Sequence, residues 1–275
     1  MPKRYNVTNY LRKNNMPHIW CPGCGNGIVT SAFLRSFDDL KINPDQTVVV
    51  SGIGCSSRVT GYLDFNTLHT THGRALAFAT GVKLGNPKLE VIVMTGDGDI
   101  TAIGGNHFLH ACRRNINITT IVFNNSIYGM TGGQSSPLTP REVSTRTAPY
   151  GNIEEPLKIS ELAITAGATF VARGATFYPL QLEELIRQAL ENRGFSLVEA
   201  ITQCPVHYGR ASKIGGAVEM LKWQRENTLS ITAADRLPPE AKKNKILRGV
   251  LSHTRRPEYV EEYEKQLFSN NQGRY

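Results

Sequence analysis

The sequence holds 275 residues, with 31 Lys and Arg against 23 Asp and Glu, so its formal net charge is +8. Hydrophobic residues make up 40% of the chain, and no apolar run reaches the roughly 18–20 residues that a membrane-spanning helix needs. These values exclude a disordered tail, a collagen-like repeat and a membrane span. The N-terminal segment lacks the apolar stretch of a signal peptide, so we expect a cytoplasmic protein with no membrane partner. The positive charge predicts an acidic partner, such as nucleic acid, a phosphorylated cofactor or an acidic protein.

The middle of the chain alternates short apolar runs with segments rich in helix-forming residues. In chain order, the predicted elements are strand 47–54, helix 73–85, strand 90–96, helix 104–115, strand 118–125, helix 159–167, strand 169–174, helix 179–194 and strand 195–204. This alternation predicts an α/β fold in which helices cover both faces of a mostly parallel sheet.

The strand pattern stops after residue 205. Segments 215–227 and 255–268 are typical of surface helices, and a polar stretch rich in Pro and Lys joins them. We therefore predict a domain over residues 1–215 and a helical, irregular extension over residues 216–275.

Polar residues follow two of the predicted strands. Asp97, Gly98 and Asp99 come directly after strand 90–96, and Asn125 ends strand 118–125. One strand–helix–strand unit separates them, so both loops reach the same edge of the sheet, where ligands bind in such folds. Asp97 and Asn125 can offer two oxygen ligands to Mg²⁺, and Gly98 lets a phosphate approach the backbone. An ordinary turn would explain the glycine motif alone, but not its combination with the asparagines and this spacing.

Four of the five cysteines lie in predicted loops. Cys21 and Cys24 form a CxxC motif in a Gly/Pro loop, and Cys55 and Cys204 each follow a predicted strand. Four thiolates suit either a [4Fe–4S] cluster or a structural zinc ion, and their spacing does not separate the two. Cys112 lies inside a predicted helix among apolar neighbours, so we interpret it as a small buried hydrophobic residue.

Several segments of the sequence resemble one family of enzymes. The pattern GDGD, 24 further residues and NN, followed by SIYGMTGGQ, resembles the thiamine-diphosphate signature of the pyrophosphate-binding domain. The segments HIWCPGCGNG, SGIGCSSR, THGRA and YGMTGGQSSPLTP are similar to the β subunits of 2-oxoacid:ferredoxin oxidoreductases, especially of the 2-oxoglutarate type. The resemblance covers about residues 10–215. It implies that residues 1–215 form a thiamine-diphosphate domain with iron–sulfur loops.

The resemblance also implies roles for individual residues. It assigns Mg²⁺ to Asp97, Asn125 and the backbone carbonyl of Ile127. It assigns the remaining cofactor contacts to Ile53, Gly54, Cys55, Ser56, His72, Gly73, Gly98, Asp99, Gly129 and Met130. It makes Cys21, Cys24, Cys55 and Cys204 ligands of one [4Fe–4S] cluster, and so favours iron–sulfur over zinc.

Two residues are candidates for a direct part in the reaction. Arg58 follows the Cys55 loop and can bind the distal carboxylate of 2-oxoglutarate through its bidentate guanidinium, or else it is a surface or interface residue. His72 is assigned to the same site, with helix capping as the alternative. The segment Thr131-Gly132-Gly133 lacks a Lys that relatives with broader substrates often carry, which weakens any transfer of substrate contacts.

By this resemblance, the chain takes part in the CoA-dependent oxidative decarboxylation of 2-oxoglutarate to succinyl-CoA and CO₂. Its electrons would pass through the cluster to ferredoxin. A larger α subunit would carry the pyrimidine-binding domain, in an (αβ)₂ assembly. A pyruvate or broad 2-oxoacid enzyme is an alternative, as is a thiamine-dependent decarboxylase without redox chemistry. A zinc-stabilised basic binding protein is a third, but we find no aromatics interleaved with a basic patch and expect no nucleic-acid partner.

Overall fold

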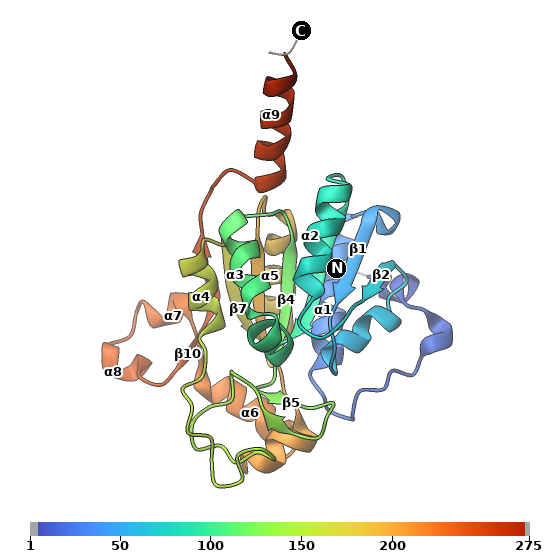
Figure 1. The fold of residues 1–275 in the computed structure, drawn as a ribbon. Helices are drawn as coiled ribbons and strands as arrows, with labels where there is room; N and C mark the ends of the chain where they lie inside the picture. Colours follow the sequence, from blue (N-terminus) through green and yellow to red (C-terminus); the bar gives the residue numbers. More distant parts are fainter. Residues whose placement is uncertain (1–4, 273–275) are drawn as a thin grey trace.

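The computed structural model describes residues 5–272, and within them one large sheet forms the centre of the molecule (Figure 1). The strands of this sheet lie in the order β2-β1-β3-β4-β8-β7-β10-β9. Their bounds are β1 (Thr47–Ser51), β2 (Asn66–His69), β3 (Glu90–Gly96), β4 (Thr119–Asn124), β7 (Phe170–Ala175), β8 (Ser196–Ile201), β9 (Thr228–Ser230) and β10 (Ile246–His253). From β2 to β7 all neighbouring strands are parallel. The predicted α/β fold is therefore confirmed.

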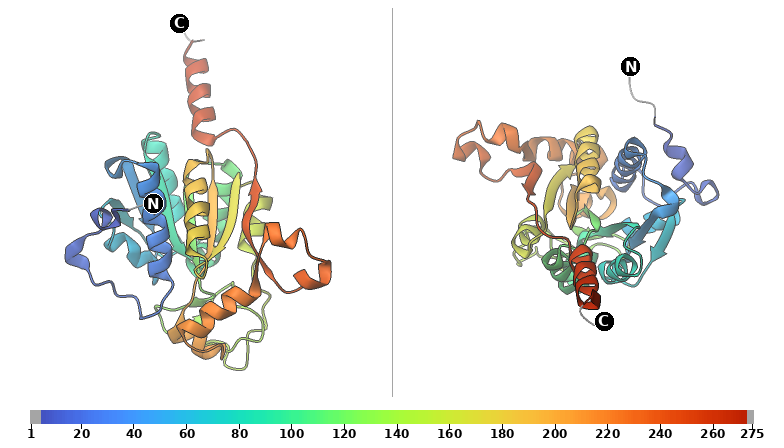
Figure 2. Two further views of the ribbon diagram at one scale, coloured as in Figure 1. Left: turned by 180° about the vertical axis from the view of Figure 1, so that it is seen from behind. Right: turned by 90° about the horizontal axis from the view of Figure 1, so that it is seen from above.

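Helices cover both faces of the sheet (Figures 1 and 2). One face packs against α1 (Asn26–Leu40) and α5 (Pro179–Glu191), and the other against α2 (Ala75–Gly85), α3 (Gly105–Arg114) and α4 (Ile159–Ala166). Successive residues of a strand point to opposite faces, so β3 contributes Ile92 and Met94 to the first core and Val91 and Val93 to the second. Cys112 is fully buried in the second core, as predicted.

The prediction that the strand pattern stops after residue 205 is wrong. Residues beyond 215 form the helices α6 (Ala217–Asn227), α7 (Ile231–Ala234), α8 (Pro239–Lys242) and α9 (Tyr259–Gln272), but also the strands β9 and β10. β10 pairs antiparallel with β7, and β9 pairs parallel with β10. The pattern was missed because β10 contains Arg248 and Gly249, is only half buried and changes register between Val250 and Ser252.

The two ends of the sheet differ. The loops after the parallel strands gather at one edge, together with the small hairpin β5 (Ile127–Tyr128) and β6 (Gln134–Ser135) and with α6. Helix α9 projects from the opposite edge (Figures 1 and 2). The carboxyl edge thus collects the residues singled out from the sequence. No helix in residues 5–272 is long and apolar enough to cross a membrane.

Candidate functional site

Asp97 lies at the end of β3 and is only 3% exposed. One of its carboxylate oxygens accepts a hydrogen bond from Ser136 Oγ at 2.5 Å. Burial raises the pKa of Asp97 to about 7, although hydrogen bonds from Ser136 and from the backbone of Gly98 and Asn125 oppose this effect. Within the described part of the chain no cationic side chain pairs with this carboxylate. A bound metal ion would stabilise a carboxylate that is buried without a cationic partner. Asp97 therefore fits its predicted role as a Mg²⁺ ligand.

The Asn125 loop meets Asp97 across the edge of the sheet. The backbone of Asn125 donates a hydrogen bond to the Asp97 carboxylate, and Asn125 Oδ1 accepts one from the backbone N–H of Ile127 at 3.2 Å. Ser126, between them, adopts a positive φ of 59°, which turns the chain sharply into β5. The structure therefore brings together all three residues predicted to hold the cation.

A buried network that the sequence analysis missed supports this loop. Asn124 Nδ2 donates to Glu199 Oε1 at 2.8 Å, while Asn124 Oδ1 accepts from the backbone N–H of Ser126 at 3.1 Å. Glu199 also accepts from Ser160 Oγ at 2.5 Å and from Arg173 Nε at 2.7 Å. Burial alone would raise the pKa of Glu199, but Arg173, Ser160 and Asn124 together lower it, so the carboxylate is ionised. The signal available in the sequence was Glu199 itself, the one charged residue in the strand β8.

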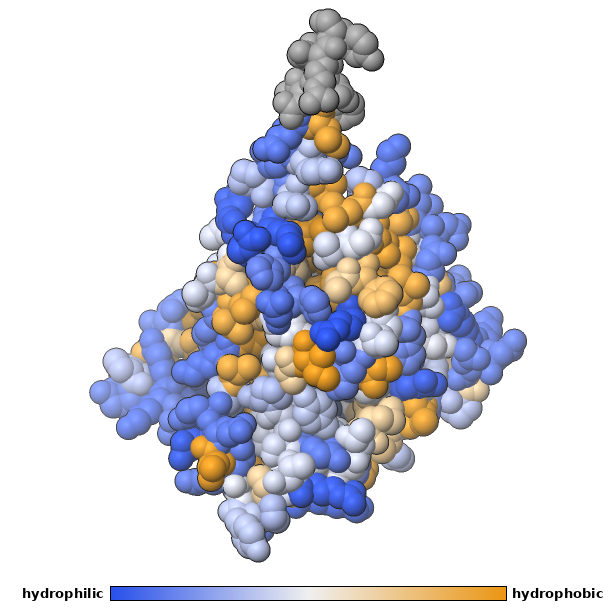
Figure 3. Space-filling model, in the orientation of Figure 1, coloured by the Kyte–Doolittle hydropathy of each residue, from blue (hydrophilic) through white to orange (hydrophobic). Residues whose placement is uncertain are grey.

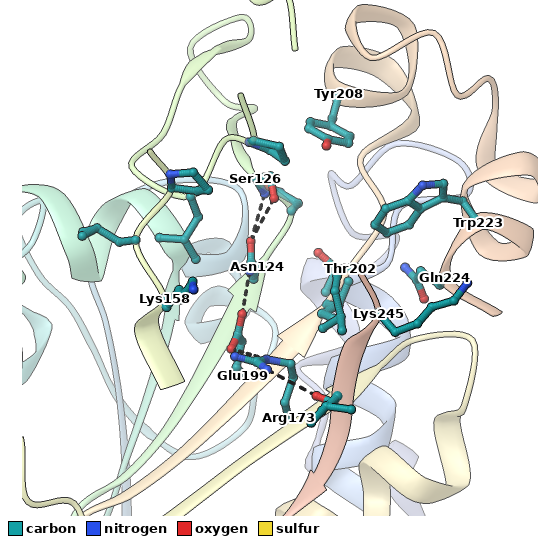
Figure 4. A pocket seen from close by; sticks show the side chains of 18 of the residues that line it. Asn124, Ser126, Lys158, Arg173, Glu199, Thr202, Tyr208, Trp223, Gln224 and Lys245 are labelled. Atoms are coloured by element: carbon teal, nitrogen blue, oxygen red, sulfur yellow. Dashed lines mark hydrogen bonds and ion pairs between the residues drawn. The ribbon is translucent and has the colours of Figure 1, made fainter. Parts of the chain in front are cut away.

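A cavity of about 490 Å³ lies on the other side of the same loop (Figure 4). Asn124, Glu199 and Arg173 form part of its wall. Thr202, Trp223 and Lys245 face it from the loop after β8, from α6 and from the segment before β10. Sequence reasoning gave no sign of this cavity because the tail supplies much of its wall.

Asp99 connects three separate segments of the chain. It is 3% exposed, and its Oδ1 accepts from the backbone N–H of Gly73 at 2.7 Å and of Ile53 at 3.3 Å. Its Oδ2 accepts from Thr95 Oγ1 at 2.7 Å. His72 Nδ1 lies 2.6 Å from Asp99 Oδ1, and because an ionised carboxylate only accepts, Nδ1 carries the proton. The carboxylate is thus engaged with protein donors, and it fixes the Ile53 and His72 segments relative to β3.

Tyr128 covers Gly98, a contact that the sequence did not reveal. A Cβ atom on Gly98 would lie 2.3 Å from Tyr128 Cε1, and the Tyr128 hydroxyl donates to the Gly98 carbonyl at 3.1 Å. Burial raises the pKa of Tyr128 to about 12, with contributions from the charges of Asp97 and Asp99. Only glycine fits beneath this ring.

The predicted rim residues differ in exposure. Ile53 is 43% and Met130 46% exposed, and Arg58 is exposed with no side-chain hydrogen bond or ion pair among residues 5–272. Gly54 has a φ of 132° and no neighbouring atom within 4 Å of a Cβ placed there. Ser56, by contrast, is buried against the end of β3, where its Oγ would lie 3.0 Å from a Cβ on Gly96. Ile53, Gly54, Arg58 and Met130 are therefore accessible to a ligand or to a partner.

The four loop cysteines come together beside this site. Burial raises the pKa of Cys24 to about 12, and the charges of Cys204, Cys55 and Cys21 add to the effect. Burial likewise raises the pKa of Cys55 to about 11, with contributions from Cys204 and Cys21. This mutual electrostatic effect requires that the four sulfur atoms lie near one another.

Two hydrogen bonds assemble the cysteine loops. Trp20, which precedes the CxxC motif, is 8% exposed and donates from Nε1 to the Cys55 carbonyl at 2.6 Å. The backbone N–H of Gly25, which follows the motif, donates to the carbonyl of Gln203 at 3.0 Å. Segments far apart in the sequence are thereby held around one space.

The chemistry of this donor set fits an iron–sulfur cluster. Among residues 5–272 no three His, Cys, Asp or Glu side chains are arranged closely enough to bind a single metal ion. Four cysteine thiolates are the usual ligand set of a [4Fe–4S] cluster, in which each thiolate binds a different iron. Thiols with raised pKa values also need a positive centre to become thiolates.

Gly129 links the two parts of the site. A Cβ atom placed on it would lie 3.5 Å from Cys55 Sγ, 3.6 Å from Cys204 Sγ and 4.0 Å from His207 Cδ2. His207, which the sequence analysis did not select, also lies 3.4 Å from a Cβ on Gly133. Since Gly129 follows the Asn125–Tyr128 segment directly, the cysteines and the predicted Mg²⁺ ligands belong to one continuous site.

Comparison with known proteins identifies the class of protein to which the chain belongs. Residues 52–200 match the family described as the C-terminal TPP binding domain of thiamine pyrophosphate enzymes. Among curated proteins, the chain is 49% identical to the 2-oxoglutarate synthase subunit KorB of Methanocaldococcus jannaschii, over 93% of this chain and 95% of that protein. It is 56% identical to KorB of Archaeoglobus fulgidus, over 80% of each.

A solved structure agrees with these relatives. The chain superposes with a TM-score of 0.86 and 33% identity on the 2-oxoglutarate:ferredoxin oxidoreductase from Magnetococcus marinus, over 98% of this chain and 92% of that one. That structure has 2-oxoglutarate, coenzyme A and succinyl-CoA bound. The chain belongs to the family of 2-oxoglutarate synthase KorB subunits, the β subunits of 2-oxoacid:ferredoxin oxidoreductases.

Proposed function

We propose that this chain, with a larger α subunit, converts 2-oxoglutarate, coenzyme A and oxidised ferredoxin into succinyl-CoA, CO₂ and reduced ferredoxin. The observation that carries the proposal is the meeting of two sets of residues at Gly129. One set, around Asp97 and Asn125, suits Mg²⁺ and a diphosphate, and the other is the four cysteines. The relatives named 2-oxoglutarate synthase and the ligands of the solved neighbour support the choice of substrate.

Asp97, Asn125 and the carbonyl of Ile127 would hold Mg²⁺, and Gly98 and the Gly129–Met130 segment would adjoin the diphosphate. When bound, thiamine diphosphate supplies a carbanion and an electron sink for decarboxylation. Asp99 would act through the segments that it fixes, keeping Ile53 and Gly73 beside the cofactor. In the neutral tautomer that carries its proton on Nδ1, His72 can accept a proton or a hydrogen bond at Nε2.

Cys21, Cys24, Cys55 and Cys204 would hold one [4Fe–4S] cluster, which supplies one-electron transfer next to the thiamine site. Arg58 is exposed and unpaired within the described residues, so its guanidinium is available for the distal carboxylate of 2-oxoglutarate. Pyruvate lacks that carboxylate, which distinguishes this proposal from the pyruvate alternative.

The surface supports a subunit partner on the face that carries α2. Phe78, Leu84 and Ile103 are 49%, 42% and 51% exposed, and they lie on α2 and on the π-helical turn Asp99–Ile103. The space-filling view shows apolar surface gathered over this part of the molecule (Figure 3). Exposed apolar area of this kind favours a protein interface, and we propose that the α subunit occupies it, in an (αβ)₂ assembly.

The test is anaerobic co-expression with the α subunit, followed by metal analysis and assays. We expect about four irons and four sulfides per β chain, and reduction of methyl viologen that requires 2-oxoglutarate, coenzyme A and the α subunit. Zinc in place of iron would support the basic binding protein. Decarboxylation without either metal would support the simple decarboxylase, and turnover by the β chain alone would contradict the need for a partner.

A further inference from the structure

A groove of about 380 Å³ lies beside the CxxC loop. Pro22 forms one wall, and the segment after Cys204 forms the other, with Val206, Arg210 and Lys213. Gly23 packs tightly against the start of α6, since a Cβ on it would lie 2.5 Å from Ala217 Cβ. The groove is therefore built by the same two loops that carry Cys21, Cys24 and Cys204.

The groove presents two cations without partners. Arg210 and Lys213 are exposed, and neither side chain makes a hydrogen bond or ion pair with any residue in the range 5–272. Glu219 is the acidic residue next to the groove, and its carboxylate accepts the backbone N–H of Gly216 at 3.0 Å as part of the α6 cap. The groove consequently combines apolar walls from Pro22 and Val206 with unneutralised positive charge.

The groove also adjoins the most accessible cysteine. Cys21 is exposed, Cys24 and Cys55 are half buried, and Cys204 is buried. Since Pro22 follows Cys21, the groove is at the edge where a cluster held by these thiols would come nearest to solvent. Electron transfer between proteins is fastest at such an edge because its rate falls steeply with distance.

We propose that this groove is the docking surface for ferredoxin, a small acidic carrier that accepts one electron at a time. The inference rests on the proposed function. At each docking the carrier gains one electron and leaves reduced, so two dockings remove the two electrons released by one oxidative decarboxylation. Arg210 and Lys213 supply charge complementary to an acidic surface, which raises the rate of encounter. A small interface suits the transient contact of an electron carrier.

The test uses the double variant Arg210→Glu/Lys213→Glu in the αβ holoenzyme. Its control is Lys242→Glu/Lys243→Glu, which makes the same change in net charge at the C-terminal end of the protruding helix α8 (Figure 1). We expect the groove variant to lose about tenfold or more in kcat/KM for ferredoxin at low salt, and a similar factor in ferredoxin affinity measured by calorimetry. The loss shrinks as ionic strength rises, because salt screens the charges.

Methyl viologen separates this proposal from the proposed function. We expect 2-oxoglutarate-dependent viologen reduction, iron content and α-subunit co-purification to match the wild type in both variants. Equal ferredoxin kinetics and affinity in the two variants would overturn the docking proposal. Loss of the α subunit from the groove variant would overturn it too, because the groove would then belong to the subunit interface. If the wild-type complex reduces no viologen with 2-oxoglutarate, the proposed function itself fails.

Discussion

The side-chain amide of Asn124 donates to the buried carboxylate of Glu199 at 2.8 Å, and these residues lie on the adjacent strands β4 and β8. Asn124 in turn accepts the backbone N–H of Ser126, which lies between two of the predicted Mg²⁺ ligands. The ion pair of Glu199 with Arg173 beneath the loop therefore fixes the path of the chain through the metal site.

Replacing Glu199 by Gln should weaken Mg²⁺ binding by roughly tenfold or more, as expected for a residue that orients metal ligands through another group. Mg²⁺ affinity is measured by titration at a temperature where both proteins are folded. Glu191→Gln is the matched control, since Glu191 forms an exposed ion pair with Arg187 on α5. Unchanged Mg²⁺ affinity in Glu199→Gln would show that the hydrogen-bond network around Glu199 has only a structural role.

The same variant has a defined pH dependence of stability. The folded pKa of Glu199 lies below the unfolded value of about 4.3. Its stabilising effect is therefore complete above that value and is lost as pH falls through the folded pKa. We expect Glu199→Gln to cost about 3 kcal/mol at pH 7, and the difference from wild type to shrink in acid. Urea denaturation at several pH values measures this, and a difference that stays constant into acid would contradict the ionised state.

Asp99→Asn tests the connection between the Ile53, Gly73 and Thr95 segments. An amide oxygen can replace only part of the acceptor capacity of the carboxylate, and one donor loses its partner at a cost of about 1–3 kcal/mol. We expect thiamine-diphosphate affinity of the αβ complex to fall at least tenfold, with iron content unchanged. Asp64→Asn, at an exposed carboxylate 3.8 Å from Arg12, serves as the control. Affinity equal to that of the control would show that Asp99 does not position the cofactor segments.

Trp20→Phe removes the hydrogen bond to the Cys55 carbonyl and keeps most of the ring volume. We expect loss of iron in air to become several-fold faster, because the CxxC and Cys55 loops are no longer tied together, and a stability cost of about 1–2 kcal/mol. The visible absorbance of the cluster follows the loss. Trp223→Phe is the matched control, since within the described part of the chain its indole makes no hydrogen bond. Equal rates of iron loss in the two variants would show that Trp20 does not hold the CxxC and Cys55 loops together.

Arg58→Ala tests the substrate contact. Loss of a charge-assisted bidentate contact should lower kcat/KM for 2-oxoglutarate by about 10–100-fold, with little change for pyruvate, which has no distal carboxylate. Arg58→Lys should recover part of the activity because it retains the charge without the fork. Equal losses with both substrates would instead place Arg58 at an interface or in a general structural role.

The sequence by itself determined the parallel sheet and the residues of the candidate site. The alternation of apolar strands and helices was sufficient for the parallel sheet, because strands buried on both faces must be continuously apolar. The positions of Asp97 and Asn125 after neighbouring strands predicted that they would meet, since parallel strands end at one edge. The four loop cysteines were distinguishable from Cys112 because only the latter lies inside a predicted helix, next to apolar residues.

Only the tertiary structure decided how these groups are held. Trp20 and Cys55, Asn124 and Glu199, and Asp99 and Gly73 are joined by single hydrogen bonds between distant segments, and no local pattern encodes such pairs. The strand β10 was hidden because an edge position, a bulge and partial burial remove the alternation by which strands are recognised. The hydrogen bonds between distant segments and the strand β10 both depend on long-range pairing. Such pairing is determined by the energy of the whole packed chain rather than by any one segment.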